Sequence, residues 1–456
     1  MIALAQENAL VLGLGMTGLS MVRWLKRAGA RVRVADSRES PPNVATLRQE
    51  FPDVAVDFGP FQAKSFEGVS LLALSPGVAK AEPLVEQSRA RGVHLVGDVE
   101  LFAQAQPELA PAPVLAITGS NGKSTVTALT GEMCKRAGKR AVVAGNIGIP
   151  VLDALTEAQS SVPDVFVLEL SSFQLETTSN LNAAAATCLN LSEDHLDRYS
   201  GMGEYADAKA RIFQGDGVQV LNRQDEACAR MARPARKVRR FGLDFPASND
   251  DWGLRTQGGH LWLSQGESAL MRVDEMRMEG MHNAANALAA LALCRSIDLP
   301  YEPLLDTLRT FEGLAHRVQK VAEVRGVVFF DDSKGTNVGA TVAALSGFTR
   351  PTVLIAGGEG KGQDFAPLAE PVRRRARAVV LIGRDAPLIE VALGASGVQL
   401  LRATSMQEAV DIALGCAQPG DAVLLSPACA SFDMFRNYEH RAQAFVQAVR
   451  ALEARA

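Results

Sequence analysis

Short apolar runs alternate with helix-length segments in three successive series along the 456 residues of this chain. Examples are "ALVLGLG" in the first series, "VLAITGS" in the second and "PTVLIAGG" in the third. Strands separated by helical crossovers are typical of mainly parallel sheets covered by helices. A chain of this length also has room for about three domains. We therefore predict an α/β protein with domains at residues 1–107, 108–313 and 314–456.

Three segments outside the regular alternation carry predictions of their own. Residues 105–114, "AQPELAPAPV", contain three prolines and predict a linker between the first two domains. Residues 215–275 contain glycines and alternating strand-like residues, which predict a small side sheet. Residues 280–294, "GMHNAANALAALALC", are apolar on nearly all sides and predict a buried helix.

The composition argues against several kinds of partner. The formal net charge is −4, and the basic runs at 233–240 and 373–377 are short enough to be solvated faces, so we expect no nucleic-acid binding. The six cysteines form no C-x-x-C pair, which is typical of a reducing compartment and argues against a zinc site or a disulfide framework. The first residues lack the basic segment of a signal peptide, and no apolar run reaches membrane-spanning length. We therefore expect a soluble, cytoplasmic protein without membrane insertion.

The first series contains a G-x-G-x-x-G turn made by Gly13, Gly15 and Gly18. The turn lies between a strand-like run and a helical segment, and Asp36 ends the next strand-like run about twenty residues later. This spacing predicts a Rossmann-like domain that binds a diphosphate at a helix N-terminus. The turn alone leaves open whether the ligand is the nicotinamide cofactor of an oxidoreductase or another nucleotide.

The second series contains "AITGSNGKST" at residues 116–125, a glycine-rich turn between a strand and a helix. The N–H groups of such a turn can cradle phosphates, Lys123 can reach the outer phosphates of ATP, and the Ser124 hydroxyl can bind Mg²⁺. Ile117 occupies the position of the first glycine in the full P-loop pattern, so this loop is shorter. A tight turn with an incidental lysine is the alternative. The combination of residues favours a P-loop ATPase-like central domain.

Acidic residues follow two strand-like runs of the same series. Glu169 ends "VFVLE", and "SEDHLD" places Glu193, Asp194, His195 and Asp197 after the next run. These groups would lie at the same edge of the sheet as the phosphate loop, which predicts a metal site there. A carboxylate after a strand is also a common helix cap. Because Mg²⁺ prefers oxygen ligands, the residue types alone leave the role of His195 open.

Eight motifs of the chain resemble those of the Mur ligases, and the last of them resembles the members that add D-glutamate. They are "GSNGKST", "GNIG", "ELSSFQLE", "NLSEDHLDRY", "HNAANALAAL", "AHR", "DDSKGTN" and "LLSPACASFDMFRNYEHR". The resemblance covers all three domains, although "GSNGKST" alone would also fit a folylpolyglutamate synthase. It implies a central P-loop ATPase-like domain between Rossmann-like N-terminal and C-terminal domains. The first binds the UDP-linked substrate, the second ATP and the third the amino acid.

The resemblance implies an ATP-dependent, amide-forming ligase of peptidoglycan precursor synthesis. In this family the carboxylate of UDP-N-acetylmuramoyl-L-alanine is phosphorylated, and the amine of D-glutamate attacks the acyl phosphate. Such a site neutralises phosphoryl charge with metals, amides and cations rather than with a covalent nucleophile. The implied cofactors are ATP and Mg²⁺, with Mn²⁺ as a substitute. We also expect a monomer.

Carried over motif by motif, the resemblance implies five overlapping groups of site residues. The catalytic residues are Lys123, His195, Lys209 and Lys334, and the metal ligands are Ser124, Glu169, His195 and a carbamylated Lys209. ATP meets Gly119, Asn121, Gly122, Lys123, Ser124, Thr125, Asn286, Arg317 and Asp332. The UDP-linked substrate meets Gly15, Met16, Thr17, Asp36, Ser37, Arg38, Ser75, Gly77 and Asn146. D-Glutamate meets Thr336, Lys361, Ser431 and Phe432, with Tyr438 beside them.

Two of these positions need comment. An ammonium group cannot coordinate a cation, so Lys209 would be a ligand only as the carbamate that the family forms. Without the resemblance it would be interpreted as a surface lysine on a helix. After "AHR" the family commonly has an acidic residue where this chain has Gln319, so the pairing around Arg317 departs from the family pattern.

Other interpretations stay open at this point. One is a different ATP-dependent amide ligase, such as a folylpolyglutamate synthase or a Mur ligase for another amino acid. Another is an NAD-dependent oxidoreductase or a nucleotide-binding module without turnover. Because ATP would bind to the second domain while Lys334 and Lys361 belong to the third, the ligase interpretation also predicts hinge closure near residues 311–316.

Overall fold

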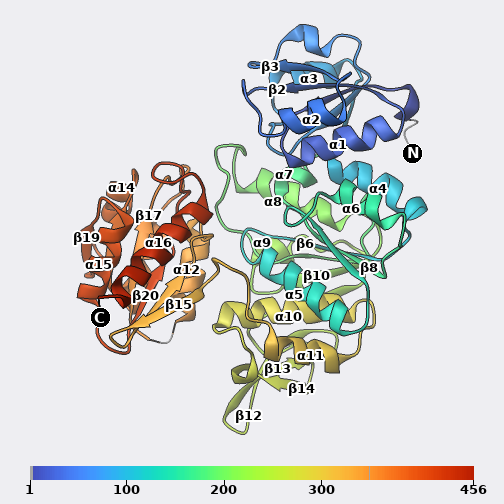
Figure 1. The fold of residues 1–456 in the computed structure, drawn as a ribbon. Helices are drawn as coiled ribbons and strands as arrows, with labels where there is room; N and C mark the ends of the chain where they lie inside the picture. Colours follow the sequence, from blue (N-terminus) through green and yellow to red (C-terminus); the bar gives the residue numbers. More distant parts are fainter. Residues whose placement is uncertain (1–3, 349, 456) are drawn as a thin grey trace.

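The computed structural model describes residues 4–348 and 350–455, and it forms three α/β bodies, each built on its own sheet (Figure 1). The predicted fold class is confirmed. Of the helices in the described ranges, none combines the length and apolarity that a bilayer crossing requires.

The first body is a five-stranded parallel sheet in the order β3-β2-β1-β4-β5. Its order reverses between β1 and β4, and ligands of such sheets bind outside the carboxyl ends of the strands at this point. The strands are β1 (Asn8–Leu12), β2 (Arg31–Asp36), β3 (Ala55–Phe58), β4 (Leu71–Leu74) and β5 (His94–Val96). The helices are η1 (Leu4–Gln6), α1 (Met16–Arg27), α2 (Val44–Glu50), η2 (Ala63–Phe66) and α3 (Pro83–Ala90).

The central body is a nine-stranded sheet in the order β14-β13-β12-β11-β10-β9-β6-β8-β7. The strands are β6 (Val114–Thr118), β7 (Ala141–Gly145), β8 (Val165–Glu169), β9 (Ala185–Cys188), β10 (Val218–Asn222), β11 (Val238–Phe241), β12 (Trp252–Gln257), β13 (His260–Gln265) and β14 (Ser268–Arg272). The helices are α4 (Asp98–Leu109), α5 (Lys123–Arg136), α6 (Val151–Ala158), α7 (Ser172–Leu175), α8 (Met202–Ala210), η3 (Arg211–Phe213), α9 (Glu226–Ala229), η4 (Val273–Glu275), α10 (Met281–Arg295) and α11 (Tyr301–Thr310). The predicted buried helix is confirmed as α10, whose residues from Ala287 to Cys294 are all buried.

The prediction of a separate side sheet in residues 215–275 is wrong. Strands β10 to β14 continue the central sheet, and β12 joins β11 through the pair Phe241 and Trp252. The hairpins bury Trp252, Leu254 and Leu263 in the same core as α10. Their alternating pattern therefore reflects strands with one face on the main core, and it does not indicate a second core.

The prediction of a linker at residues 105–114 is also wrong for its first half. Helix α4 runs through Pro107 to Leu109, so the connection to β6 is only residues 110–113. The apolar face of α4 decides the outcome, since Phe102 is fully buried and packs edge-on against Phe166 with 5.4 Å between ring centroids. The Gln106 amide then donates to the Ala110 carbonyl at 2.6 Å and holds the turn that follows.

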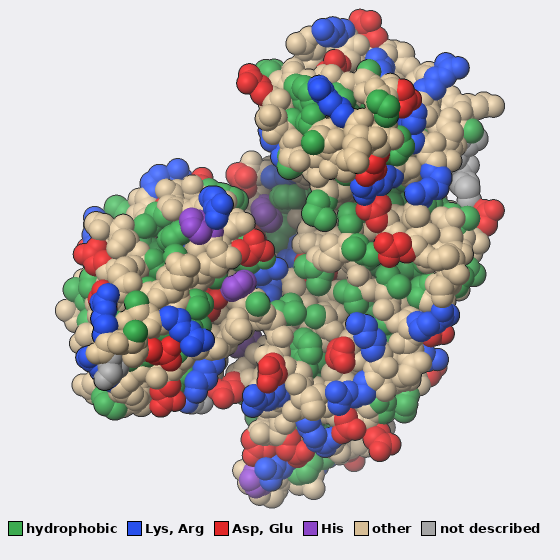
Figure 2. Space-filling model, viewed as in Figure 1, with side chains coloured by type: hydrophobic (Ala, Val, Ile, Leu, Met, Phe, Trp, Pro, Cys, Tyr) green, Lys and Arg blue, Asp and Glu red, His purple; other side chains and the backbone are tan. Residues whose placement is uncertain are grey.

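The third body is a six-stranded sheet in the order β15-β16-β20-β17-β18-β19, parallel except for the edge strand β15. The strands are β15 (Gln319–Val324), β16 (Val327–Asp331), β17 (Thr352–Gly357), β18 (Ala376–Ile382), β19 (Gln399–Arg402) and β20 (Ala422–Leu425). The helices are α12 (Val338–Gly347), η5 (Ala366–Leu368), α13 (Ala369–Arg375), α14 (Ala386–Leu393), α15 (Met406–Cys416) and α16 (Tyr438–Glu453). Figure 2 shows a hollow between this body and the other two, with Lys, Arg and His side chains along its walls.

Candidate functional site

The phosphate loop lies between β6 and α5, where a glycine-rich turn opens a long helix. Gly122 caps α5 with a φ of 83°, and a Cβ atom there would lie 2.6 Å from Oδ1 of Asn286. Only glycine fits this backbone and this close approach. Lys123 Nζ donates to the carbonyls of Gly119 and Ser120, each at 2.9 Å. The Lys123 ammonium group thus lies against the phosphate loop, where the outer phosphates of a nucleotide would bind.

Glu169 ends β8 beside the phosphate strand β6, and its carboxylate is 1% exposed. Oε1 accepts a hydrogen bond from Asn146 Nδ2 at 2.7 Å, whereas Oε2 has no partner among the residues that the structure describes. A buried carboxylate oxygen without a partner is costly, which makes this edge a good position for a cation. In the described ranges no three His, Cys, Asp or Glu side chains are arranged so that they could hold a metal ion, so a cation here also needs other ligands.

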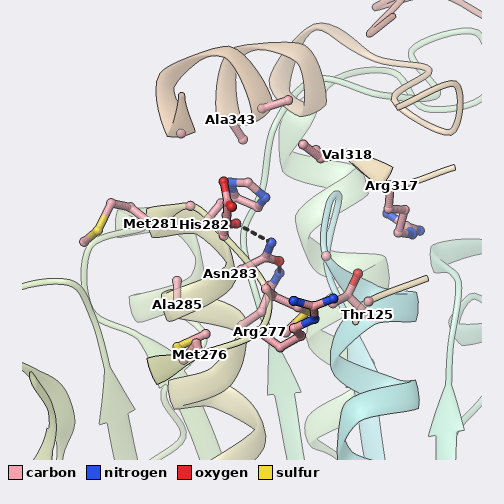
Figure 3. Close-up of a pocket in the computed structure, with 18 of the residues that line it drawn as sticks. Thr125, Met276, Arg277, Met281, His282, Asn283, Ala285, Arg317, Val318 and Ala343 are labelled. Carbon is pink, nitrogen blue, oxygen red and sulfur yellow. Dashed lines mark hydrogen bonds between the residues drawn. The ribbon is translucent and has the colours of Figure 1, made fainter. Parts of the chain in front are cut away.

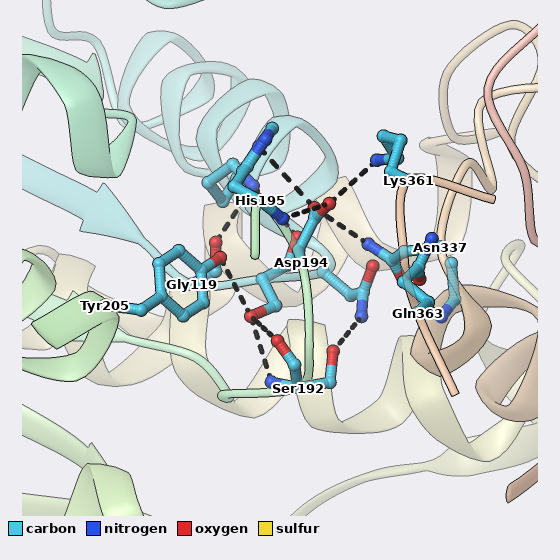
Figure 4. A network of polar contacts seen from close by, with 12 residues as sticks. Gly119, Ser192, Asp194, His195, Tyr205, Asn337, Lys361 and Gln363 are labelled. Atoms are coloured by element: carbon cyan, nitrogen blue, oxygen red, sulfur yellow. Dashed lines mark hydrogen bonds and ion pairs between the residues drawn. The ribbon is translucent and has the colours of Figure 1, made fainter. Parts of the chain in front are cut away.

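Asp194 is the centre of a polar network that joins the second and third bodies (Figure 4). Its carboxylate lies 2.8 Å from Lys361 Nζ and accepts a hydrogen bond from Asn337 Nδ2 at 3.1 Å. Burial alone would raise the pKa of Asp194, but Lys361 and His195 bring it below its usual value, so the group is ionised. His195 follows with a φ of 56°, and burial lowers the pKa of its imidazole. A neutral imidazole can bind a metal.

Lys209 lies on α8 and is buried, contrary to what its position on a helix would suggest. Its Nζ donates to the Gly119 carbonyl at 2.9 Å and lies 4.6 Å from the ring centre of Tyr205. Burial, helped by the charge of Lys123, lowers the pKa of Lys209 to about 7. The amine is therefore uncharged in a large fraction of molecules at neutral pH, and an uncharged amine is a nucleophile.

A cavity of about 1370 Å³ opens between the start of α5, the start of α10 and the third body (Figure 3). Six of the residues assigned to ATP line it, namely Asn121, Gly122, Thr125, Asn286, Arg317 and Asp332. Arg317 Nη2 donates to the Ser124 hydroxyl at 2.9 Å across the boundary between the bodies. Burial raises the pKa of Asp332 to about 7, and the Ser426 hydroxyl donates to it at 2.6 Å.

Sequence reasoning missed several residues of this cavity, among them His282 and Asn283 at the first turn of α10. Burial lowers the pKa of His282 to about 4, and no described residue bonds its Nδ1 atom. The signal was present in "HNAANALAAL", because polar residues at the open N-terminus of an apolar helix are available to a ligand. The apolar pattern of the motif by itself predicts only a buried helix.

Three of the residues assigned to D-glutamate lie on neighbouring segments of the third body. Glu359 forms a β-bridge with Ala430, and the Gln363 side chain accepts a hydrogen bond from the Val338 N–H. Lys361 belongs to the third body and contacts Asp194 of the second, and Ser431 is buried in the loop before α16. The ring of Phe432 is 71% exposed. Tyr438 instead lies beside the catalytic candidate Lys334, whose Nζ is 5.2 Å from its ring centre. Thr336 is half-buried in the segment between Lys334 and α12.

The glycine turn of the first body adopts the packing that its sequence predicts. A Cβ atom on Gly18 would lie 1.8 Å from the Gly13 carbonyl oxygen, so α1 can pack this closely only with glycine there. The carboxylate of Asp36 accepts hydrogen bonds from Leu14 N at 2.6 Å and from two guanidinium nitrogens of Arg38. Because Leu14 and Arg38 already donate hydrogen bonds to the carboxylate of Asp36, this group is not free to bind a ribose hydroxyl, as the corresponding acid does in a dinucleotide-binding enzyme.

The other residues assigned to the UDP-linked substrate surround this turn. Met16, Ser37 and Arg38 are exposed, and Gly15 and Thr17 are half-buried at the start of α1. Ser75 and Gly77 follow β4, the strand beside β1 at the point where the sheet order reverses. Asn146 lies apart from them, on the second body beside Glu169.

Comparisons with known proteins find one family along the whole chain. The family models match as Mur ligase MurD-like N-terminal domain at residues 7–97, Mur ligase middle domain at 117–294 and Mur ligase glutamate ligase domain at 316–429. The chain is 58% identical to the UDP-N-acetylmuramoylalanine--D-glutamate ligase of Methylobacillus flagellatus over 99% of both chains. It is 55% identical to the protein of the same name from Nitrosomonas europaea, over 98% of this chain and 97% of that one.

A solved structure supports the fold. The UDP-N-acetylmuramate-alanine ligase from Thermotoga maritima superimposes with a TM-score of 0.60 at 17% identity, over 98% of this chain and 100% of that chain. At this level of identity the likeness concerns the three-body architecture alone.

Proposed function

The chain belongs to the Mur ligase family, and from this we propose that it is an ATP-dependent ligase that adds D-glutamate to UDP-N-acetylmuramoyl-L-alanine in peptidoglycan precursor synthesis. The alanyl carboxylate attacks the γ-phosphorus of ATP, which gives an acyl phosphate and ADP. The amine of D-glutamate then attacks the acyl carbon, and phosphate leaves as the amide forms. The proposal is carried by the 58% identity, over 99% of both chains, to a relative with this name.

ATP is assigned to the cavity between the second and third bodies. Lys123 and the N–H groups of residues 119–125 hold its phosphates, and Arg317 adds positive charge from the other side of Ser124. Asn286 contributes from the first turns of α10, and Asp332 is assigned to the ribose. Lys334 lies near Tyr438 and would meet the phosphoryl group as it is transferred. These cations neutralise the charge that both steps bring together.

Mg²⁺, or Mn²⁺ in its place, would be held by Ser124, Glu169, His195 and the carbamate of Lys209. The free Oε2 atom of buried Glu169 and the neutral imidazole of His195 fit such a cation. When bound, the cation neutralises the charge of the phosphoryl oxygens.

The carbamate of Lys209 forms when the uncharged amine attacks CO₂ and loses a proton. Replacing Lys209 with alanine should abolish acyl-phosphate formation, and short carboxylates should restore part of it. Wild-type activity of this variant would remove Lys209 from the site.

The two remaining substrates are assigned to the outer bodies. The UDP group is assigned to Gly15, Met16, Thr17, Ser37, Arg38, Ser75 and Gly77, and the muramoyl group to Asn146. The buried Asp36 contributes by holding the guanidinium of Arg38. Lys361 binds a carboxylate of D-glutamate together with Thr336, Ser431 and Phe432. Its ammonium group has three N–H donors, so it can do this while one of them stays on Asp194. We also propose that the protein acts as a monomer. ATP and UDP-linked sugars are available in the cytoplasm, which supports that location.

The test is phosphate release from ATP with UDP-N-acetylmuramoyl-L-alanine, with and without D-glutamate, and with L-glutamate and L-lysine in parallel. We expect release only with D-glutamate. Release with a folate and L-glutamate instead would keep the ligase chemistry and overturn the assignment of the first body. Tight ATP binding without release under any condition would indicate a binding module. Saturable binding of a nicotinamide cofactor, followed by fluorescence, would revive the oxidoreductase alternative.

A further inference from the structure

Arg198 is a buried cation that the proposed mechanism leaves without a role. It follows His195 by three residues, and its side chain is only 12% exposed. Its guanidinium donates to the Pro76 carbonyl at 2.7 Å and to the Val78 carbonyl at 3.2 Å. Both carbonyls belong to the first body, whereas Arg198 belongs to the second.

The charge of Arg198 is balanced within its own body. Two of its nitrogens bond the carboxylate of Glu176, at 2.8 and 3.2 Å, and Tyr199 Oη donates to the same carboxylate at 2.6 Å. Burial raises the pKa of Tyr199, so its hydroxyl stays a donor. Because Glu176 already neutralises Arg198, the bonds to the two carbonyls are not needed to balance its charge. Their role is to fix the loop of the first body against the second.

The loop that Arg198 holds is the one that follows β4, at the point where the sheet order of the first body reverses. In a trans peptide the C=O and N–H groups point in opposite directions. Holding the Pro76 carbonyl therefore turns the N–H of Gly77 away from Arg198. Gly77 is exposed, and a Cβ atom built on it would touch nothing within 4 Å, so the space beside this residue is open to an anion.

His195 lies at the other end of the short segment 195–198 that carries Arg198. The N–H groups of Arg198 and Tyr199 donate to the His195 carbonyl at 2.9 and 3.2 Å and close a turn. The ring of Phe173 contacts both side chains, with its centre 4.6 Å from the His195 ring centre and 3.9 Å from the Arg198 guanidinium carbon. A shift of the Arg198 side chain would therefore change the positions of both the loop at residues 75–78 and the His195 side chain.

We infer that Arg198 is a positioning residue for the UDP-linked substrate, because it fixes the loop at 75–78 at a set distance from His195. The substrate must span both places, since its diphosphate is assigned to the first body and its carboxylate to the second. This inference rests on the proposed function. If the ion pair between Arg198 and Glu176 were purely structural, its removal would lower the stability of the protein and weaken the binding of all ligands alike.

The test compares Arg198→Lys and Glu176→Gln with the wild-type protein and with Arg230→Lys, a matched control at an exposed ion pair. Calorimetry measures the Kd of UDP-N-acetylmuramoyl-L-alanine without ATP or metal, the Kd of ATP, and the Tm. A lysine cannot reach both carbonyls and Glu176, so we expect its Kd for the UDP-linked substrate to rise about tenfold or more. The Kd of ATP should stay within about twofold. Glu176→Gln, which keeps Arg198 in place, should show a smaller rise of the same kind.

Two results would overturn the inference. One is binding of the UDP-linked substrate by Arg198→Lys within about twofold of the wild-type protein. The other is an equal loss for both ligands together with a lower Tm in both variants. Failure of the wild-type protein to bind the UDP-linked substrate would instead overturn the proposed function, so the two failures can be told apart.

Discussion

The second body meets its two neighbours in opposite ways. Against the first body it forms one continuous apolar core, in which Val11, Phe102 and Phe166 belong to the same buried cluster. Against the third body the contacts are polar, with Arg317 on Ser124 and with Lys361 and Asn337 on Asp194. The buried clusters of the third body contain no residue of the second within the described ranges.

This difference indicates which boundary can move. Separating two faces of a shared core exposes apolar surface to water, which opposes opening by about 25 cal/mol for every Å². Separating polar contacts exchanges them for contacts with water or ligand at little net change. The first two bodies should therefore move as one unit, and the third should open and close around the hinge predicted near residues 311–316.

The largest effect is expected from Phe102→Ala, on helix α4 of the second body, whose ring belongs to the core that the first two bodies share. The ring is fully buried against Phe166, so its removal should lower the free energy of unfolding by about 3–5 kcal/mol. Urea denaturation measures this, with the exposed Phe245→Ala as a control that should change by less than about 0.5 kcal/mol. A loss below about 1 kcal/mol for Phe102→Ala would show that this part of the shared core is not tightly packed.

Lys361→Met tests the second boundary. Removing one member of a buried ion pair costs about 3–5 kcal/mol where the interface is fixed. Because this interface can open and hydrate Asp194, we expect a loss below about 1 kcal/mol by urea denaturation. The KM for D-glutamate should rise about 10- to 100-fold, since a charged hydrogen bond to its carboxylate is lost. A stability loss of about 3 kcal/mol or more would show that the boundary is as fixed as the first.

Asp98→Asn tests the first boundary through the pH dependence of stability. Asp98 starts α4 at the first boundary, and burial raises its pKa in the folded protein to about 6 from 3.8. Its stabilising contribution is therefore fully present below about pH 4 and is lost as the pH rises through 6. The asparagine variant avoids this loss and should be about 2 kcal/mol more stable than the wild-type protein at pH 8, with no such gain at pH 3.5. A gain that does not vary with pH would exclude Asp98 as its source.

Asn337→Ser should have the smallest effect on stability. Asn337 caps α12 by accepting a hydrogen bond from the Ala340 N–H, and serine caps equally well, so only the bond to Asp194 is lost. We expect a change below about 0.5 kcal/mol, together with a more open average shape in small-angle scattering without ligands. ATP and the UDP-linked substrate should close the wild-type protein and, less completely, this variant. Profiles that do not change with ligands in either protein would contradict hinge motion.

The strand-to-helix turns were predictable because their chemistry is local. Gly18 and Gly122 each permit a close approach that no other residue allows, and Glu169 follows its strand directly. The sequence could also predict that these turns share one edge of a sheet, since parallel strands place their carboxyl ends together.

What could not be predicted depends on packing between distant segments. The burial of Phe102 overrides the helix-breaking tendency of Pro107, and a proline count cannot show this. The environment of Lys209 comes from the phosphate loop, about ninety residues away along the chain, so its low pKa has no local signal. The contacts of Arg198 reach across 122 residues to Pro76.

The pairing of Lys361 with Asp194 has a consequence for inhibitor design. A compound that imitates only the carboxylates of D-glutamate brings negative charge close to the ionised Asp194 as well as to Lys361, and the repulsion from Asp194 reduces its attraction to the site. A compound that presents an ammonium group to Asp194 and a carboxylate to Lys361 meets an opposite charge at both places. Selectivity should therefore favour zwitterions over simple dicarboxylates of the same size.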